Sequence, residues 1–290
     1  MKASILITGC SKGIGMATAL VLGRAGHKVY ATMRDPGRYP ELAQITEKET
    51  LPIQVFTMDV DSDDSVKQTI SAIQRERGPI DVLVNNAGIE RSGSVEEMNI
   101  SAFREVMETN YFGPLRCIQS VLPQMRERRN GCIINVASIA GRIACSPFAP
   151  YTASKYALEA LSEVLAQEVK AFNVRVAIVE PGIIDTSMAR GLGETLTLSA
   201  YPQKRRIAGL FSASLQNPVS PSLVGEKIRE IIESQTHTLR HPVGPDALPF
   251  LQWRGTMTDE QWIDWGAADD DTWYDSITRD FGLNARSQKA

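Results

Sequence analysis

Short apolar runs alternate with amphipathic stretches from the N-terminus to about residue 245, and no internal repeat or low-complexity linker separates them. The runs are rich in Val and Ile and nearly continuous, a pattern typical of strands that are covered on both faces of a sheet. Such alternation predicts parallel strands joined by crossover helices, and therefore an α/β fold with a doubly wound parallel sheet. We expect strands at Ser4–Thr8, Lys28–Met33, Ile53–Met58, Val82–Asn85, Cys132–Ala137 and Val174–Glu180.

Helical periodicity fills the intervals between these strands. Ser62 is placed to cap the second helix, while Ser101 and Ser222 mark the starts of two later ones. Near the C-terminus, Thr258 and Gln261 have the spacing of a capping box before a further helix. The helices predicted in the first part of the chain are Ile14–Ala25, Asp63–Arg77, Ser101–Arg128, Thr152–Phe172 and Ser222–Ser234.

Length alone would allow two domains in 290 residues, because a typical domain has ~150. The unbroken alternation of strands and helices instead favours one doubly wound domain. The composition, 43% hydrophobic and 22% charged, is that of a globular protein. Lys and Arg number 31 against 34 Asp and Glu, so the chain lacks the basic excess that nucleic-acid binding needs, and we expect no nucleic-acid partner.

No apolar run is long enough for a membrane span, and the first run is too short for a signal sequence. The four cysteines show no metal-binding spacing, and thiols without disulfides suit a cytoplasmic protein. His237 and His241 stand four residues apart, but their segment has an extended pattern that ends at Pro242, so we expect no metal site.

The first strand leads directly into a glycine-rich loop that opens a helix. Glycine lets the backbone turn tightly and approach a pyrophosphate, which the N–H groups at the helix N-terminus bind. A loop in this position, between strand and helix at the start of an α/β chain, predicts a dinucleotide site rather than an ordinary turn. The loop reads Thr8-Gly9-Cys10-Ser11-Lys12-Gly13-Ile14-Gly15, and its spacing, TGxxxGxG, resembles that of the short-chain dehydrogenase/reductase family.

Further motifs of this family follow in the family's order. The resemblance covers residues 1–245 and implies a single Rossmann-type, NADP-binding catalytic domain with a helical substrate lid at about residues 187–218. Residues 246–290 lie beyond it as a C-terminal extension. The motifs are Asn85-Asn86-Ala87-Gly88 after the fourth strand, Ser138 after the fifth, Tyr151 and Lys155 in the next helix, and Pro181-Gly182-Ile183-Ile184-Asp185-Thr186 after the sixth.

Tyr151 and Lys155 stand four residues apart, so both side chains leave one face of a helix. A lysine ammonium and a helix N-terminus both favour phenolate, so we expect the pKa of Tyr151 to lie below its ordinary value. Ser138 can hydrogen-bond the substrate oxygen. The resemblance adds Asn110 and implies a catalytic set in which Tyr151 exchanges a proton with the substrate while a nicotinamide cofactor exchanges a hydride.

The end of the second strand indicates which nicotinamide cofactor is used. A carboxylate there would bind the adenine ribose and repel a 2′-phosphate, but this chain has Met33 followed by Arg34, and Lys12 lies in the glycine loop. Two cations near the ribose favour NADP(H) over NAD(H), although Asp35 could partly neutralise Arg34. By resemblance, the cofactor contacts Gly9, Ser11, Lys12, Gly13, Ile14, Gly15, Arg34, Asp59, Val60, Asn86, Ala87, Gly88, Tyr151, Lys155, Pro181, Gly182, Ile184 and Thr186.

The lid and the C-terminal extension carry the residues that could define a substrate pocket. Arg142, Cys145 and Phe148, between Ser138 and Tyr151, are further candidates. All four Trp lie in the extension, among acidic residues, and we expect them to pack on the domain, on a partner subunit or at the substrate mouth. Large apolar lid residues that could join the core or line the pocket are Met188, Leu192, Leu196, Leu198, Tyr201, Ile207, Leu210 and Phe211.

These features predict an NADP(H)-dependent oxidoreductase that interconverts a ketone or aldehyde with an alcohol. Residues 28–35 and 240–246 are similar to 17β-hydroxysteroid dehydrogenases, which favours a hydrophobic substrate of steroid, retinoid or aryl type. The alternatives are a non-catalytic NADP-binding regulator, a 3-oxoacyl-type reductase, and an epimerase or dehydratase, although relatives of that last class usually carry TGxxGxxG. Helices at Ser101–Arg128 and Tyr151–Phe172 make two-fold contacts in this family, so we expect a homodimer or homotetramer.

Overall fold

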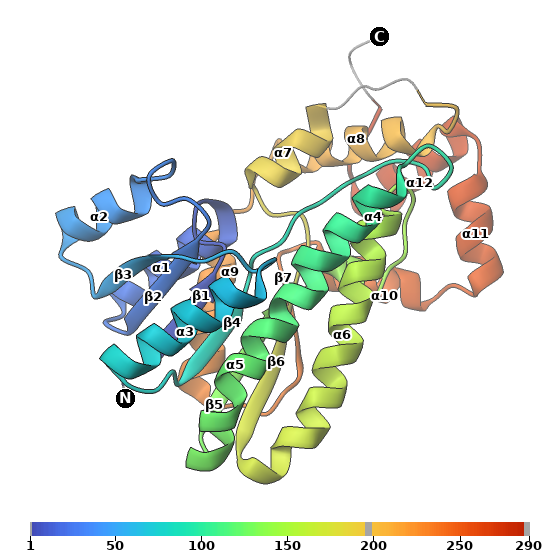
Figure 1. The fold of residues 1–290 in the computed structure, drawn as a ribbon. Helices are drawn as coiled ribbons and strands as arrows, with labels where there is room; N and C mark the ends of the chain where they lie inside the picture. The colour runs from blue at the N-terminus through green and yellow to red at the C-terminus, as the bar shows by residue number, and fades with distance from the viewer. Residues whose placement is uncertain (1, 195–198, 287–290) are drawn as a thin grey trace.

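The computed structural model describes residues 2–194 and 199–286 and places seven strands in one sheet (Figure 1). The strand order is β3-β2-β1-β4-β5-β6-β7, and every neighbouring pair is parallel, which confirms the predicted doubly wound α/β fold. Both β3 and β5 follow their predictions to within one residue. The strands are β1 (Ser4–Thr8), β2 (Lys28–Met33), β3 (Ile53–Thr57), β4 (Val82–Asn85), β5 (Gly131–Val136), β6 (Val174–Pro181) and β7 (Arg240–Val243).

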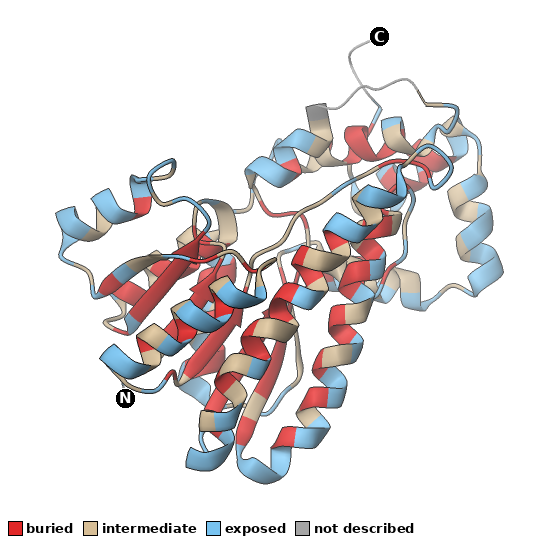
Figure 2. Cartoon of the chain, viewed as in Figure 1, coloured by how far each residue is buried: buried red, intermediate tan, exposed pale blue. Residues whose placement is uncertain are grey.

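Both faces of the sheet are buried under helices (Figure 2). Because successive strand residues point to opposite faces, Ile5 and Ile7 of β1 enter one hydrophobic cluster while Leu6 enters another. This double burial is why the strands are apolar at nearly every position. One face is covered by α1 (Gly13–Arg24), α2 (Glu41–Glu49) and α9 (Ser222–Ser234), and the other by α3 (Asp63–Arg77), α5 (Gly113–Arg128) and α6 (Ala149–Val169).

The helix predicted at Ser101–Arg128 is interrupted in the structure, so that prediction was wrong. The chain forms α4 (Ile100–Met107), a π-helical turn η1 (Glu108–Phe112) and then α5. Pro114 in the first turn of α5 has no N–H with which to continue the helical ladder. Asn110 in η1 directs its side chain to a loop outside the helix.

One of the predicted helix starts was also wrong, because Asn99 rather than Ser101 precedes α4. Ser222 is the first residue of α9, as predicted, and Pro221 precedes it. Ser62 caps α3 as predicted, with its Oγ accepting a hydrogen bond from Ser65 N at 3.2 Å. The helix predicted at Thr152–Phe172 is α6, which begins at Ala149 and ends at Val169, before a 3₁₀ turn, η3 (Lys170–Phe172).

The remaining helices follow β6 and β7, and most of them contribute to a third hydrophobic cluster, in which α8 packs against α12. Buried Arg206 of α8 joins the two, because its Nε donates to Asp270 Oδ1 at 2.8 Å and its Nη2 donates to Ala268 O at 2.7 Å. In the described ranges no helix is long and apolar enough to cross a membrane. These helices are α7 (Ser187–Glu194), α8 (Gln203–Ser214), α10 (Ala247–Gly255), α11 (Asp259–Ala267), with the predicted capping box, and α12 (Asp270–Phe281).

Candidate active site

A cavity of about 1090 Å³ lies at the carboxyl edge of the sheet, where ligands of such folds bind. It runs from the loop after β1 to the tryptophans of the C-terminal helices. The structure brings every residue of the sequence-based site together around this cavity except Asn110. Its walls include Gly9, Ser11, Lys12, Gly13, Ile14, Gly15, Arg34, Asp59, Val60, Asn86, Ala87, Gly88, Ser138, Tyr151, Lys155, Pro181, Gly182, Ile184 and Thr186.

The glycines of the first loop are required by its geometry. Gly9 has a φ of +73°, and a Cβ atom there would lie 2.7 Å from Ala87 Cα. At Gly15, a Cβ atom would lie 2.3 Å from Gly9 O. Larger side chains would therefore push apart the loop and the start of α1, whose N-terminus faces the cavity.

A second loop is bound to the first through Thr8, at the end of β1. Thr8 Oγ1 accepts hydrogen bonds from the backbone N–H groups of Asn86 and Ala87, each at 3.0 Å. Asn86 Nδ2 donates in return to Thr8 O at 2.9 Å and to Gly9 O at 3.1 Å. These contacts hold two edges of the cavity in a fixed relation.

One end of the cavity is basic. Lys12, Arg34 and Arg38 all line it, and Met33 rather than a carboxylate ends β2. Asp35 also lines this end, and its Oδ1 accepts a hydrogen bond from the backbone N–H of Arg38 at 3.0 Å, which fixes the turn between the two residues. Asp59 and its neighbours form the acidic part of the same wall.

Ser138, Tyr151 and Lys155 line the same cavity as these basic residues. Ser138 follows β5, and its hydroxyl hydrogen-bonds the Tyr151 phenol. Ser138 Oγ also accepts from Ala140 N at 3.1 Å, which fixes its position. Lys155 lies one turn after Tyr151 on α6, its Nζ donating to Val136 O at 2.9 Å and lying 5.6 Å from the centroid of the Tyr151 ring.

The expected lowering of the Tyr151 pKa is wrong for this structure. Burial raises the pKa of Tyr151 to about 12. The charge of Glu90 also raises this pKa, and the hydrogen bond from Ser138 lowers it, but both effects are smaller than that of burial. Burial also lowers the pKa of Lys155 to about 8, because the ammonium loses solvation, while Glu159 acts in the other direction. Desolvation outweighs the attraction between ammonium and phenolate on which the expectation was based.

Asn110 lies behind the cavity wall and is fully buried. Its Oδ1 accepts from Ile89 N at 2.8 Å, and its Nδ2 donates to Ile89 O at 2.9 Å and to Ser154 Oγ at 2.9 Å. Asn110 therefore clamps the segment after Gly88 against α6. No hydrogen bond from it to Lys155 is seen in the described part of the chain, so it can act on Lys155 only through other groups.

Beyond Tyr151 the cavity becomes an apolar chamber. Most of the lid candidates line it, but Tyr201 is turned away, with its hydroxyl on Glu96, and Leu196 and Leu198 lie outside the described residues. Arg142 points instead to buried Glu180, at 3.5 Å. The chamber is lined by Cys145, Phe148, Met188, Leu192, Ile207, Leu210, Phe211, Phe250, Trp253, Trp262, Trp265 and Ile277, among others.

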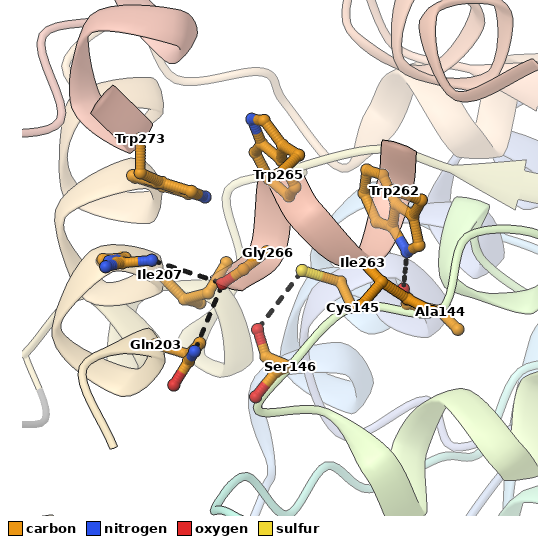
Figure 3. Close-up of a pocket in the computed structure, with 11 residues that line it drawn as sticks. Ala144, Cys145, Ser146, Gln203, Ile207, Trp262, Ile263, Trp265, Gly266 and Trp273 are labelled. Carbon is orange, nitrogen blue, oxygen red and sulfur yellow. Dashed lines mark hydrogen bonds between the residues drawn. The ribbon is translucent and has the colours of Figure 1, made fainter. Parts of the chain in front are cut away.

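A smaller aromatic pocket of about 150 Å³ adjoins this chamber and shares Cys145, Ile207, Trp262 and Trp265 with it (Figure 3). The Trp262 and Trp265 rings stack with centroids 4.7 Å apart. Trp262 Nε1 donates to Ala144 O at 2.8 Å, which joins α11 to the loop between Ser138 and Tyr151. The tryptophans of the extension thus pack on their own domain and also form part of the cavity wall.

Sequence reasoning missed several residues of this cavity. Arg38 follows the second strand by too many residues for its position to be inferred without the turn made by Asp35. Glu90 comes two residues after the motif ending at Gly88, and no pattern in the sequence indicated that its side chain lines the cavity. In the described ranges no three His, Cys, Asp or Glu side chains converge as a metal site requires, and His241 Nε2 contacts Thr238 O at 2.9 Å.

Comparison with known proteins finds that this chain is similar to dehydrogenases and reductases. A family model described as short chain dehydrogenase matches residues 3–197. Human retinol dehydrogenase 8 is 35% identical over 238 residues, covering 80% of this chain and 76% of that protein. A 3-ketodihydrosphingosine reductase of Bacteroides thetaiotaomicron is 35% identical over 249 residues, covering 83% of this chain and 87% of that protein.

Solved structures agree with this result. A short-chain dehydrogenase from Streptomyces avermitilis superposes with a TM-score of 0.78 and 31% identity, covering 92% of this chain and 97% of that one. An actinorhodin polyketide ketoreductase solved with NADPH gives a TM-score of 0.73 and 28% identity, covering 83% and 95% of the two chains.

Proposed function

This chain belongs to the short-chain dehydrogenase/reductase family of oxidoreductases, and on that premise we propose that it interconverts a ketone or aldehyde with an alcohol, using NADP(H). The observation that carries the proposal is the single cavity that connects the glycine loop with Ser138, Tyr151 and Lys155. The names of its relatives, a retinol dehydrogenase and a ketodihydrosphingosine reductase, support an alcohol or a ketone as substrate.

In this proposal Tyr151 transfers the proton. During reduction the Tyr151 hydroxyl donates a proton to the carbonyl oxygen, and in the reverse direction Tyr151 accepts the proton of the alcohol. The Ser138 hydroxyl lies within hydrogen-bonding reach of Tyr151, and it turns its single proton to the same substrate oxygen and orients it. The Lys155 ammonium stabilises the negative charge that Tyr151 gains when its proton leaves. Asn110 acts as a positioning residue through its clamp on Ile89.

The residues at the basic end fit NADP(H). Glycines let the first loop pack closely against Ala87 and against its own backbone, and the α1 N-terminus beside it opens onto the cavity, where it could bind a pyrophosphate. Lys12, Arg34 and Arg38 supply the cations that a 2′-phosphate requires, and an arginine can bind it in a bidentate manner. When bound, the cofactor supplies or accepts the hydride. The rest of the contact set predicted from the sequence lines the same wall and is proposed to hold the cofactor.

The apolar chamber supports a hydrophobic substrate of steroid, retinoid or aryl type. Sites of this kind bury most of a ligand against apolar and aromatic side chains. We assign residues 1–245 to the catalytic domain, with residues 187–218 as the lid and 246–290 as an extension that completes the chamber with its tryptophans. The proposal also includes a cytoplasmic location, supported by four free cysteines, and a homodimer or homotetramer, supported by exposed Phe112 in η1 and exposed Val164 on α6.

A ketone and alcohol panel with both cofactors tests the proposal. We expect NADPH to bind more tightly than NADH, measured by nicotinamide fluorescence, and at least one hydrophobic ketone to be reduced, measured by loss of NADPH absorbance. Binding of NADPH with no turnover of any panel member would favour the non-catalytic regulator. Tighter binding of NADH would refute the role given to Arg34 and Arg38, and absence of binding to either cofactor would refute the proposal as a whole.

A further inference from the structure

Glu90 is a carboxylate in the wall of an otherwise apolar substrate chamber. It is only partly exposed, and it lines the cavity close enough to Tyr151 for its charge to act on the phenol. Burial raises the pKa of Glu90 above its ordinary value, while Ser92, Arg91 and Lys204 act in the opposite direction and favour the ionised form. The proton-transfer scheme above assigns it no role.

The carboxylate of Glu90 lacks the partner that a buried charge normally has. Ser92 hydrogen-bonds it, but Oε1 is buried without a hydrogen-bond partner, and within the described ranges no cation lies at ion-pair distance. The neighbouring Arg91 is engaged elsewhere, because its Nη2 donates to Glu105 Oε1 at 2.8 Å and its Nη1 donates to Glu90 O at 2.9 Å. A buried carboxylate oxygen without a partner costs free energy that a ligand could offset.

The backbone of Glu90 is held in place. Asn110 clamps the preceding residue, Ile89, through both its N–H and its carbonyl group, at 2.8 and 2.9 Å. Asn110 itself is fully buried and bound to α6 through Ser154. The carboxylate is therefore presented from a rigid segment, as a side chain that orients a substrate should be.

We propose that Glu90 is a specificity-determining residue whose carboxylate accepts a hydrogen bond from a hydroxyl or ammonium group beside the reacting carbonyl. The preferred substrates are then α-hydroxy or α-amino ketones with an apolar body that fills the chamber. This inference rests on the proposed function, because it takes Tyr151 as the point at which the carbonyl is bound. A site built to bind a substrate donor discriminates strongly against the analogue that lacks it.

The test compares three ketones on three proteins. Propiophenone, α-hydroxypropiophenone and α-aminopropiophenone differ only in the donor beside the carbonyl. The wild type is compared with Glu90→Gln, which removes the charge but keeps an acceptor, and Glu90→Leu, which removes both. Glu127→Gln is the matched control, since it makes the same charge change on an exposed residue of α5 outside the cavity. Thermal melting and NADPH binding show that each variant folds.

We expect Glu90→Leu to lower kcat/KM for a donor-bearing ketone about 10- to 100-fold, the range for a hydrogen bond to a charged group, and to leave propiophenone within about twofold. If the substrate donor is an ammonium group, Glu90→Gln should lower kcat/KM for the amino ketone as much as Glu90→Leu does. If the donor is a hydroxyl group, Glu90→Gln should retain part of the wild-type kcat/KM for the hydroxy ketone. Glu127→Gln should leave all three values unchanged.

Three results would overturn the proposal. Equal losses on all three ketones, with a shifted pH profile, would show that Glu90 acts only through the charge it places near Tyr151. Unchanged kcat/KM in both Glu90 variants would show that it contacts no substrate. Failure of the wild type to reduce any of the three while reducing other ketones would exclude this substrate class. Absence of any ketone reduction would instead count against the proposed function itself.

Discussion

Tyr151 and Lys155 are both buried ionisable side chains, and loss of solvation favours the neutral form of each. For Tyr151 the neutral form is the proton donor that carbonyl reduction needs. For Lys155 the neutral form is the inactive one, since only the ammonium can stabilise a developing phenolate. The two residues therefore respond to pH in different ranges, with Lys155 titrating near 8 and Tyr151 near 12.

This difference predicts the pH dependence of reduction. Because the pKa of Lys155 is lowered to about 8, its charge is present below that pH and is lost as the pH rises through it. We expect kcat/KM for reduction to fall above about pH 8 while Tyr151 remains protonated. In Lys155→Arg this falling limb should disappear, because a guanidinium keeps its proton. The measurement is kcat/KM for reduction as a function of pH in both proteins. If Lys155→Arg still loses activity above about pH 8, another group must be responsible for that loss.

At the scale of elements, strands β1 to β6 were predictable because burial in the sheet makes most of their positions apolar. Ile5, Leu6 and Ile7 show this directly, with the middle residue facing the opposite cluster from its neighbours. Strand β7 was missed because its sequence is mostly polar and only Val243 is buried.

The break at η1 was not predicted, because apolar periodicity runs through it. Pro114 was the available signal in the sequence, whereas the hydrogen bonds between Asn110 and Ile89 are tertiary contacts that the sequence does not show. Helix α2 was missed because its sequence is mostly polar and it buries only Leu42.

The site divides in the same way. The glycine loop was recognisable in the sequence because only glycine fits where the backbone packs closely, as at Gly9 against Ala87. Arg38 and Glu90 were not visible, because their positions depend on the turn at Asp35 and on the Asn110 clamp. The sequence also could not predict the direction in which the pKa of Tyr151 shifts, because that direction depends on how deeply the side chain is buried.

The contact between α8 and α12 offers a test at this scale, because two adjacent arginines bind one carboxylate. Arg206 is 3% exposed and also donates to Ala268 O, whereas the Arg205 side chain is 56% exposed. We expect Arg206→Leu to lower the free energy of unfolding by roughly 1–3 kcal/mol, as for loss of a buried charged hydrogen bond. Arg205→Leu should change it by less than about 1 kcal/mol. Urea unfolding measures the free energy of unfolding of both variants, and equal losses in Arg206→Leu and Arg205→Leu would contradict this account.

At the scale of the whole molecule, the cavity joins parts of the chain that are far apart in sequence. The sheet edge supplies the cofactor end, α6 supplies Tyr151 and Lys155, and the C-terminal helices supply the tryptophan wall. The aromatic pocket of Figure 3 shows how closely the extension is attached, since Trp262 is hydrogen-bonded to the loop just before the α6 residues. Residues of the C-terminal helices, beyond the proposed catalytic domain, therefore line the apolar chamber.

The most direct test of the central claim is the turnover of Tyr151→Phe, measured beside NADPH binding. The account predicts that kcat for ketone reduction falls by about two to four orders of magnitude, because the proton donor is lost, while NADPH affinity stays within a few-fold of the wild type. Tyr156→Phe, a change on the same helix outside the cavity, should retain full activity. Turnover by Tyr151→Phe close to the wild-type rate would contradict the account.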